Sequence, residues 1–157
     1  MQWLIESQLK RKWDGIVIHH SACEDTEGLE ITKIKEWHTK GLKWRDIGYH
    51  FVVEKVEDDI VIAVGRPLTL DGAHCRGYNH HMIGICFVGN YSKEKPDVKM
   101  WYEAIKRLII PLMRTFHIDL FNIYGHKELC RTECPGKYFD MNDFRAYINR
   151  VIEKEGL

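Results

Sequence analysis

Residues 125–136, GHKELCRTECPG, concentrate side chains that can bind a metal or take part in redox chemistry. They include His126, Cys130 and Cys134, and Cys134 is followed by a Pro-Gly turn. A redox pair of Cys130 and Cys134 is disfavoured, because the spacing is wider than Cys-X-X-Cys and lacks that motif's position at a helix start. A metal site needs more ligands than this segment supplies, so the remaining ligands must come from elsewhere in the chain.

Histidines are the candidates for these ligands, since the chain has nine of them. Any single histidine is more often a solvated or hydrogen-bonded side chain than a ligand, but two of these lie at the ends of predicted strands, where side chains are held rigidly. His19 lies late in the β-branched run 15–22, and His126 follows the run 121–125. Together with Cys134 they give two imidazoles and one thiolate, a set that suits zinc. Three protein ligands leave a fourth position open, which is typical of a catalytic site, and no other residue is clearly placed to close a structural one.

The elements that must position these residues follow from the apolar pattern. Short apolar runs predict strands, and apolar residues at the i, i+3, i+4 period predict helices. A long polar loop at 66–81 separates the two halves of the pattern. The predicted strands are 15–22, 82–89 and 121–125, and a hairpin is predicted at 48–65 with its turn at Glu57–Asp59. Helices are predicted within 30–42, with Gly41 as C-cap, from Asp97 to Phe116, and from near Asp140. The second of these helices should be kinked or broken near Pro111.

Strands interleaved with helices predict an α/β fold, with a central mixed sheet flanked by helices and the zinc site at the strand ends. The 157 residues show no repeat and no linker, so we expect one domain over 1–157 with its core at about 14–150. We expect a monomer.

Composition restricts the possible partners and compartments. Lys plus Arg and Asp plus Glu both number 23, so the chain lacks the basic excess typical of nucleic-acid binding. The chain contains no run of about 18 apolar residues, so we expect no membrane insertion. The first 15 residues lack a signal-peptide pattern, and the five cysteines are an odd number, so we expect a chain that is cytoplasmic as synthesised, with reduced thiols.

Four motifs occur in an order that resembles a known family: IVIHHSA, DIGYHFVV, GAHCRGYNHHMIGICFVGNY and GHKELCRTECPG. They are similar to the zinc-dependent N-acetylmuramoyl-L-alanine amidases, the superfamily that includes phage lysozyme-type amidases and peptidoglycan recognition proteins. The resemblance covers about residues 14–150. It implies zinc ligands at His19, His126 and Cys134, with His20 as a neighbour that is not a ligand.

The same resemblance assigns further roles in the site. It places the catalytic tyrosine at Tyr49 and a second catalytic position, Lys or Thr among relatives, at Thr132. His74 and Asn79 match the substrate-side loop of the family. From the residue types alone, Thr132 could equally be a hydroxyl that stabilises the turn. For Glu128, a solvated carboxylate is the favoured interpretation over a partner of a ligand imidazole. Cys23, Cys75 and Cys130 match no pattern of the family, and we interpret them as structural or incidental.

The function implied is hydrolysis of the amide between N-acetylmuramic acid and the L-alanine of peptidoglycan stem peptides. The substrate would be peptidoglycan or a soluble muropeptide, and the closest biological analogy is a bacteriolytic phage endolysin that reaches the cell wall after release or delivery. Two alternatives remain: a peptidoglycan-binding module without activity, or a cytosolic muropeptide-recycling amidase. Relatives that only bind typically lack the cysteine ligand, which is present here as Cys134.

Overall fold

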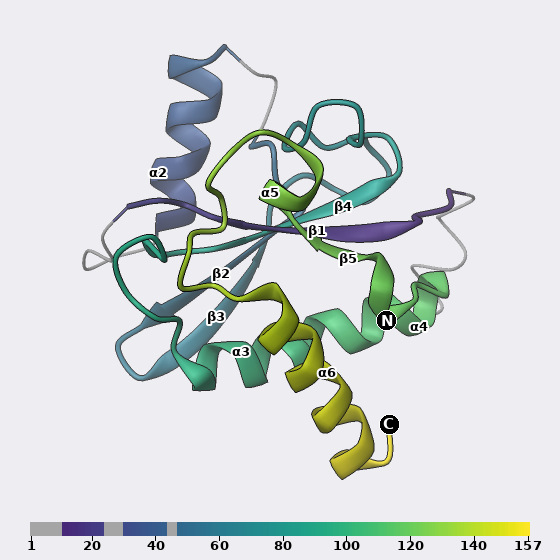
Figure 1. Ribbon diagram of the computed structural model, residues 1–157. Coiled ribbons are helices and arrows are strands. Elements are labelled where there is room, and N and C mark those ends of the chain that lie inside the picture. Colours follow the sequence, from purple (N-terminus) through teal and green to yellow (C-terminus); the bar gives the residue numbers. More distant parts are fainter. Residues whose placement is uncertain (1–10, 24–29, 44–46) are drawn as a thin grey trace.

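Five strands form one mixed sheet in the order β3-β2-β4-β1-β5 (Figure 1). The structure, a computed structural model, describes residues 11–23, 30–43 and 47–157, so the expectation for the first residues of the chain lies outside it. β1 pairs in parallel with both β4 and β5, β2 pairs in parallel with β4, and β2 and β3 form the antiparallel hairpin. The strands are β1 (Gly15–His20), β2 (Phe51–Val56), β3 (Asp59–Val64), β4 (Met82–Phe87) and β5 (Ile123–Gly125).

Helices cover both sides of this sheet: α3, α4 and α6 lie on one side and α2 on the other (Figure 1). Asp97 and Asp140 cap α3 and α6, because their side chains accept hydrogen bonds from the amides of Lys99 and Asp143. The helices are α2 (Glu30–Glu36), α3 (Val98–Ala104), α4 (Ile110–Phe116), α5 (His126–Leu129) and α6 (Met141–Glu155), with a 3-10 turn at Leu120–Asn122. The predicted α/β fold with a mixed, helix-flanked sheet is confirmed.

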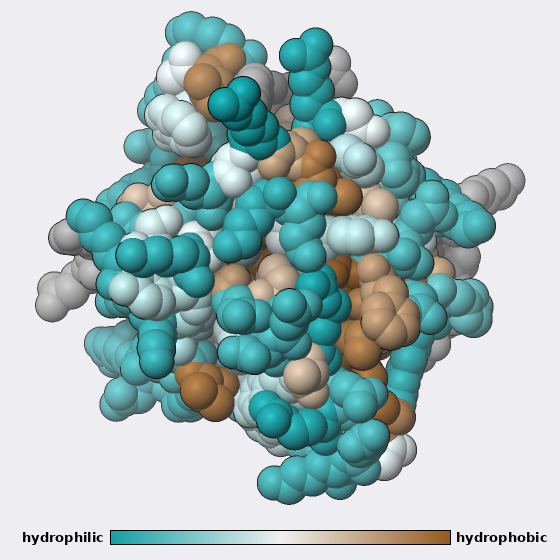
Figure 2. All heavy atoms as spheres, in the orientation of Figure 1, coloured by the Kyte–Doolittle hydropathy of each residue, from teal (hydrophilic) through white to brown (hydrophobic). Residues whose placement is uncertain are grey.

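Successive side chains of β1 alternate between the face that packs in the main core and the face that carries the candidate site. Ile16 and Ile18 belong to the large core formed with α3, α4 and α6, whereas Val17 packs on the opposite face. Since side chains two residues apart share a face, His19 lies on the face of Val17. Hydrophilic side chains cover most of the surface seen in Figure 2, with apolar ones interspersed.

Two helix details refine or differ from the prediction. The regular helix is interrupted near Pro111, as predicted, but by a π turn at Ile105–Ile109 that joins α3 to α4, and Pro111 falls in the first turn of α4. A widened turn accommodates a residue that cannot donate a backbone hydrogen bond. Gly41 is not a left-handed cap but the last residue of a second π turn, Trp37–Gly41, which extends α2 and is capped by Leu42.

Among the described residues, no helix is both long and apolar enough to cross a membrane.

Candidate metal centre

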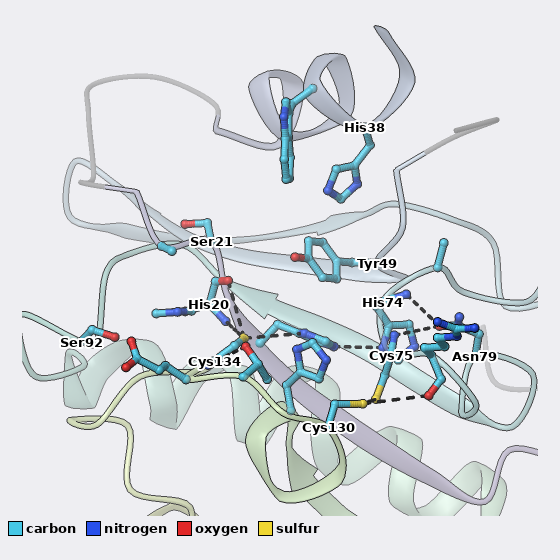
Figure 3. Close-up of a pocket in the computed structure, with 18 of the residues that line it drawn as sticks. His20, Ser21, His38, Tyr49, His74, Cys75, Asn79, Ser92, Cys130 and Cys134 are labelled. Carbon is cyan, nitrogen blue, oxygen red and sulfur yellow. Dashed lines mark hydrogen bonds between the residues drawn. The ribbon is translucent and has the colours of Figure 1, made fainter. Parts of the chain in front are cut away.

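Three potential metal ligands converge at the carboxyl ends of β1 and β5. His19 is the fifth residue of β1, and His126 directly follows β5. β1 and β5 run in parallel, with Ile18 opposite Gly125. The residues that follow these two, His19 and His126, therefore lie side by side, and their imidazole centroids are 4.5 Å apart. Cys134 completes the group, in which the ligand atoms of all three residues lie within 4.8 Å of one another (Figure 3).

Hydrogen bonds through His74 fix which nitrogen of His19 faces the centre. His74 Nε2 lies 3.0 Å from the carbonyl oxygen of Met82, which can only accept, so Nε2 carries the proton and Nδ1 is an acceptor. His74 Nδ1 lies 2.9 Å from His19 Nε2, which therefore donates. The lone pair of His19 is then on Nδ1, 3.8 Å from the sulfur of Cys134.

His74 was predicted to contact substrate, but both of its ring nitrogens are engaged by the protein. Burial, and next the nearby His50, lowers the pKa of His74 to about 3, so the ring is neutral and keeps the acceptor that His19 needs. The geometry therefore favours a positioning role for His74 over substrate binding. Asn79 lines the pocket, and its side-chain oxygen accepts hydrogen bonds from the amides of His74 and Cys75, which braces the same loop.

The loop after α5 holds Cys134 in place. The Lys127 amide donates to the Cys134 carbonyl at 2.7 Å, and the Cys134 amide donates to Thr132 Oγ1 at 3.2 Å. The His20 amide points at the Cys134 sulfur from 3.3 Å. Gly136 has a φ of +104° and would place any β-carbon against the backbone of Tyr91, so only glycine suits this turn.

The three residues fit a metal ion of borderline softness. In a tetrahedral site with usual bond lengths, an imidazole nitrogen and a thiolate sulfur lie about 3.6 Å apart, close to the 3.8 Å between His19 Nδ1 and Cys134 Sγ. Burial lowers the pKa of both His19 and His126, so both imidazoles are neutral and able to coordinate. Burial raises the pKa of the Cys134 thiol to about 11, and a bound cation would replace its proton.

Tyr49 lies beside this centre, two residues before the start of β2. Its ring is 5.1 Å from that of His19, and Figure 3 shows it in the same pocket as His74 and Cys134. Burial, together with the nearby thiols of Cys86 and Cys134, raises the pKa of Tyr49 well above 10. The phenol is therefore protonated and can donate a hydrogen bond. His38 Nδ1 accepts from the Gly48 amide at 2.9 Å and so holds the segment that carries Tyr49.

These groups line one open cavity of about 960 Å³. Thr132 and Asn79 are also at its wall, so it brings together all seven residues singled out from the sequence. Sequence reasoning missed the wall contributed by the π turn after α2, where Trp37 is 60% exposed. Further lining residues that it missed are Ser21, His38, Asn90 and Ser92.

The adjacent His20 faces away from the ligand group. Its Nδ1 accepts from the Tyr91 amide at 3.2 Å, and its ring stacks on that of Tyr91 in the main core. Strand alternation alone could not tell which of the two neighbouring histidines faces the site, and the structure places His19 there.

Glu128 is exposed to solvent, as predicted, and its carboxylate bonds to Arg145 and the Gly125 amide instead of to an imidazole. It accepts a two-pronged ion pair from Arg145 of α6 at 2.9 and 3.0 Å, and it accepts from the Gly125 amide at 2.8 Å. Burial alone would raise the pKa of Glu128, but Arg145 and the Gly125 amide outweigh it and lower the pKa. This contact fixes the start of α5, and with it His126, against α6.

Replacing His74 with alanine is expected to lower metal affinity about 10- to 100-fold, because His19 loses the acceptor that fixes its tautomer and ring orientation. Competition with a chromophoric chelator measures this affinity. His80→Ala, an exposed histidine on the same loop, is the control. Equal affinities in the two variants would contradict the positioning role of His74.

The chain is similar to known amidases and endolysins in sequence and in structure. A family model described as N-acetylmuramoyl-L-alanine amidase matches residues 9–137. The endolysin of Escherichia phage T7 is 28% identical over 141 residues, which are 87% of this chain and 88% of the endolysin. The amidase LysC from Clostridium intestinale superposes with a TM-score of 0.75 at 30% identity, covering 88% of this chain and 87% of LysC. A Drosophila PGRP-LB variant, solved in complex with tracheal cytotoxin, superposes with a TM-score of 0.70 at 26% identity, covering 83% and 79%.

Proposed function

The chain belongs to the N-acetylmuramoyl-L-alanine amidase family, and we propose that it hydrolyses the amide joining N-acetylmuramic acid to the L-alanine of peptidoglycan stem peptides. The observation that carries this proposal is the convergence of His19, His126 and Cys134 in an open cavity beside a protonated tyrosine. A module that only binds peptidoglycan has no need of a cysteine held for coordination, whereas a metal held by Cys134 would assist hydrolysis of an unreactive amide.

Zinc is the metal we propose for this site. Two neutral imidazoles and one thiolate match its ligand preference, and three protein ligands leave room for substrate. Zinc held there would supply Lewis acidity, which polarises a carbonyl oxygen and makes water a better nucleophile at neutral pH.

The side chains around the site would then divide the remaining work. Tyr49 can donate a hydrogen bond to the carbonyl oxygen as negative charge develops on it, and the high pKa keeps the proton on the phenol. His74 and Glu128 act only through the ligands, by holding His19 and the start of α5. The Thr132 hydroxyl already accepts from the Cys134 amide, so its proton is available to a group in the cavity.

A bacteriolytic role like that of the phage endolysins is the biological setting we propose, since the chain aligns with the T7 endolysin over most of both proteins. The substrate would be polymeric peptidoglycan, and the acting species a monomer. Asn79 and the polar wall of the cavity would contact the glycan or the stem peptide.

Mass spectrometry of digests tests the reaction and its substrate together. Intact sacculi and soluble anhydro-muropeptides are digested in parallel with the zinc-loaded protein. We expect stem peptides with a free L-alanine amino group, released faster from sacculi than from soluble fragments. Cleavage at another bond, or binding to sacculi without cleavage, would contradict the amidase proposal. Faster release from soluble fragments would contradict the lytic role and favour a recycling amidase.

A further inference from the structure

Two cysteines outside the proposed ligand set meet at the floor of the same cavity. The sulfur atoms of Cys75 and Cys130 lie 3.0 Å apart, although the residues are 55 positions apart in the chain (Figure 3). Cys75 follows His74 on the loop between β3 and β4, and Cys130 ends α5, which His126 begins. The pair therefore connects the segment that orients His19 with the segment that carries His126.

The pair could in principle bind a metal together with His126, since the three ligand atoms lie within 4.8 Å of one another. Two thiolates on one tetrahedral zinc ion lie about 3.8 Å apart, because each Zn–S bond is about 2.3 Å long. The observed 3.0 Å is shorter than that, so a metal at the pair would require the two sulfurs to move apart. His126 also belongs to the group with His19 and Cys134, so a metal at the cysteine pair would have to compete for it.

We propose that Cys75 and Cys130 form a reversible disulfide that ties the His74 loop to α5 and so braces the metal centre. A disulfide has an S–S distance of about 2.05 Å, which these two sulfurs reach by a movement of about 1 Å. The cysteine geometry alone carries the disulfide, whereas its effect on the metal centre and its persistence beside peptidoglycan rest on the proposed function.

The oxidant is a small disulfide such as oxidised glutathione. Both cysteines line the cavity, but Cys75 is 1% exposed and Cys130 is only partly buried, so Cys130 reacts first. Its thiolate attacks the small disulfide, forms a mixed disulfide and releases one thiol. Cys75 then attacks the Cys130 sulfur, which forms the internal bond and releases the second thiol. The two cysteines lose two electrons and two protons, and one small disulfide becomes two thiols.

The bond should stabilise the folded chain measurably. It closes a long loop in the unfolded state, and disulfides of this kind raise the melting temperature of a domain of this size by roughly 5–15 °C. Peptidoglycan lies on the oxidising side of bacterial membranes, where such a bond persists, whereas cytosolic thiol buffers would keep it open.

Equilibration in glutathione buffers, from fully reduced to fully oxidised, tests the proposal. We expect free thiols to fall from five to three, a cross-linked peptide containing Cys75 and Cys130, and a higher melting temperature that reductant reverses. Cys23→Ala should keep this response, and Cys130→Ala should abolish the rise in melting temperature.

Peptide mapping of the wild-type chain tests for the Cys75–Cys130 disulfide even if Cys130→Ala folds poorly. Full alkylation of both cysteines after oxidation would overturn the proposal, as would a cross-link through Cys134. A second equivalent of zinc that is lost in Cys75→Ala would also overturn it, in favour of a metal site at the pair.

Discussion

The Cys134→Ser variant is expected to lose most of its zinc and nearly all of its amidase activity. A neutral hydroxyl is a far weaker zinc ligand than a thiolate, and loss of a group that merely supports a ligand already costs 10- to 100-fold in affinity. We therefore expect zinc affinity to fall more than roughly 100-fold. Metal content by mass spectrometry and release of stem peptides from sacculi, measured on one preparation, give the two readouts.

Cys130→Ser is the matched control for this prediction. It makes the same chemical change four residues away, on the same loop, at a sulfur that faces Cys75 instead of His19. In reducing buffer, where no disulfide forms, this variant should keep its zinc and most of its activity. If the two variants behave in the opposite way, the ligand from this loop is Cys130 and our assignment is wrong.

The Tyr49→Phe variant is expected to lower kcat by ~100-fold or more while KM changes little. The substitution keeps the ring and removes only the hydroxyl, so packing beside His19 and His38 should survive. A hydrogen bond that forms to charge developing in the transition state contributes to kcat and not to ground-state binding. Kinetics on a purified muropeptide, with zinc content determined on the same sample, provide the measurement.

Zinc content separates the possible failures of this prediction. Retained zinc with a near-normal kcat would make Tyr49 an aromatic residue that only packs in the pocket. Loss of zinc would instead make the phenol part of the coordination. Either result would contradict the role proposed for Tyr49, which requires full zinc content and a depressed kcat.

The two histidines of the candidate centre could be located from sequence because His19 lies late in one predicted strand and His126 directly after another. Periodicity did not choose between His19 and His20, and the roles of the remaining site residues came from the resemblance to the family. The helix starts at Asp97 and Asp140 could also be predicted from local sequence, since each aspartate accepts a hydrogen bond from an amide within three residues.

Contacts between distant segments could not be predicted in the same way. The link from His19 through His74 to Met82 depends on strand register, and the Glu128–Arg145 pair depends on how α6 packs against α5. The meeting of Cys75 and Cys130 has no sequence signal, because neither residue falls in a motif with the other. The π turn before Pro111 is a partial case: the proline predicts a disturbance of the helix near this position but not its form.

Zinc X-ray absorption spectroscopy on the purified, zinc-loaded chain tests the central claim most directly, because it counts the sulfur ligands of the metal. Coordination by His19, His126 and Cys134 requires one sulfur at about 2.3 Å and nitrogen or oxygen at about 2.0–2.1 Å, with imidazole scattering from two rings. We expect that spectrum, and we expect Cys134→Ser to lose its sulfur contribution. Two sulfur ligands in the wild-type chain would place the metal at Cys75 and Cys130 and contradict the site on which the proposed chemistry depends.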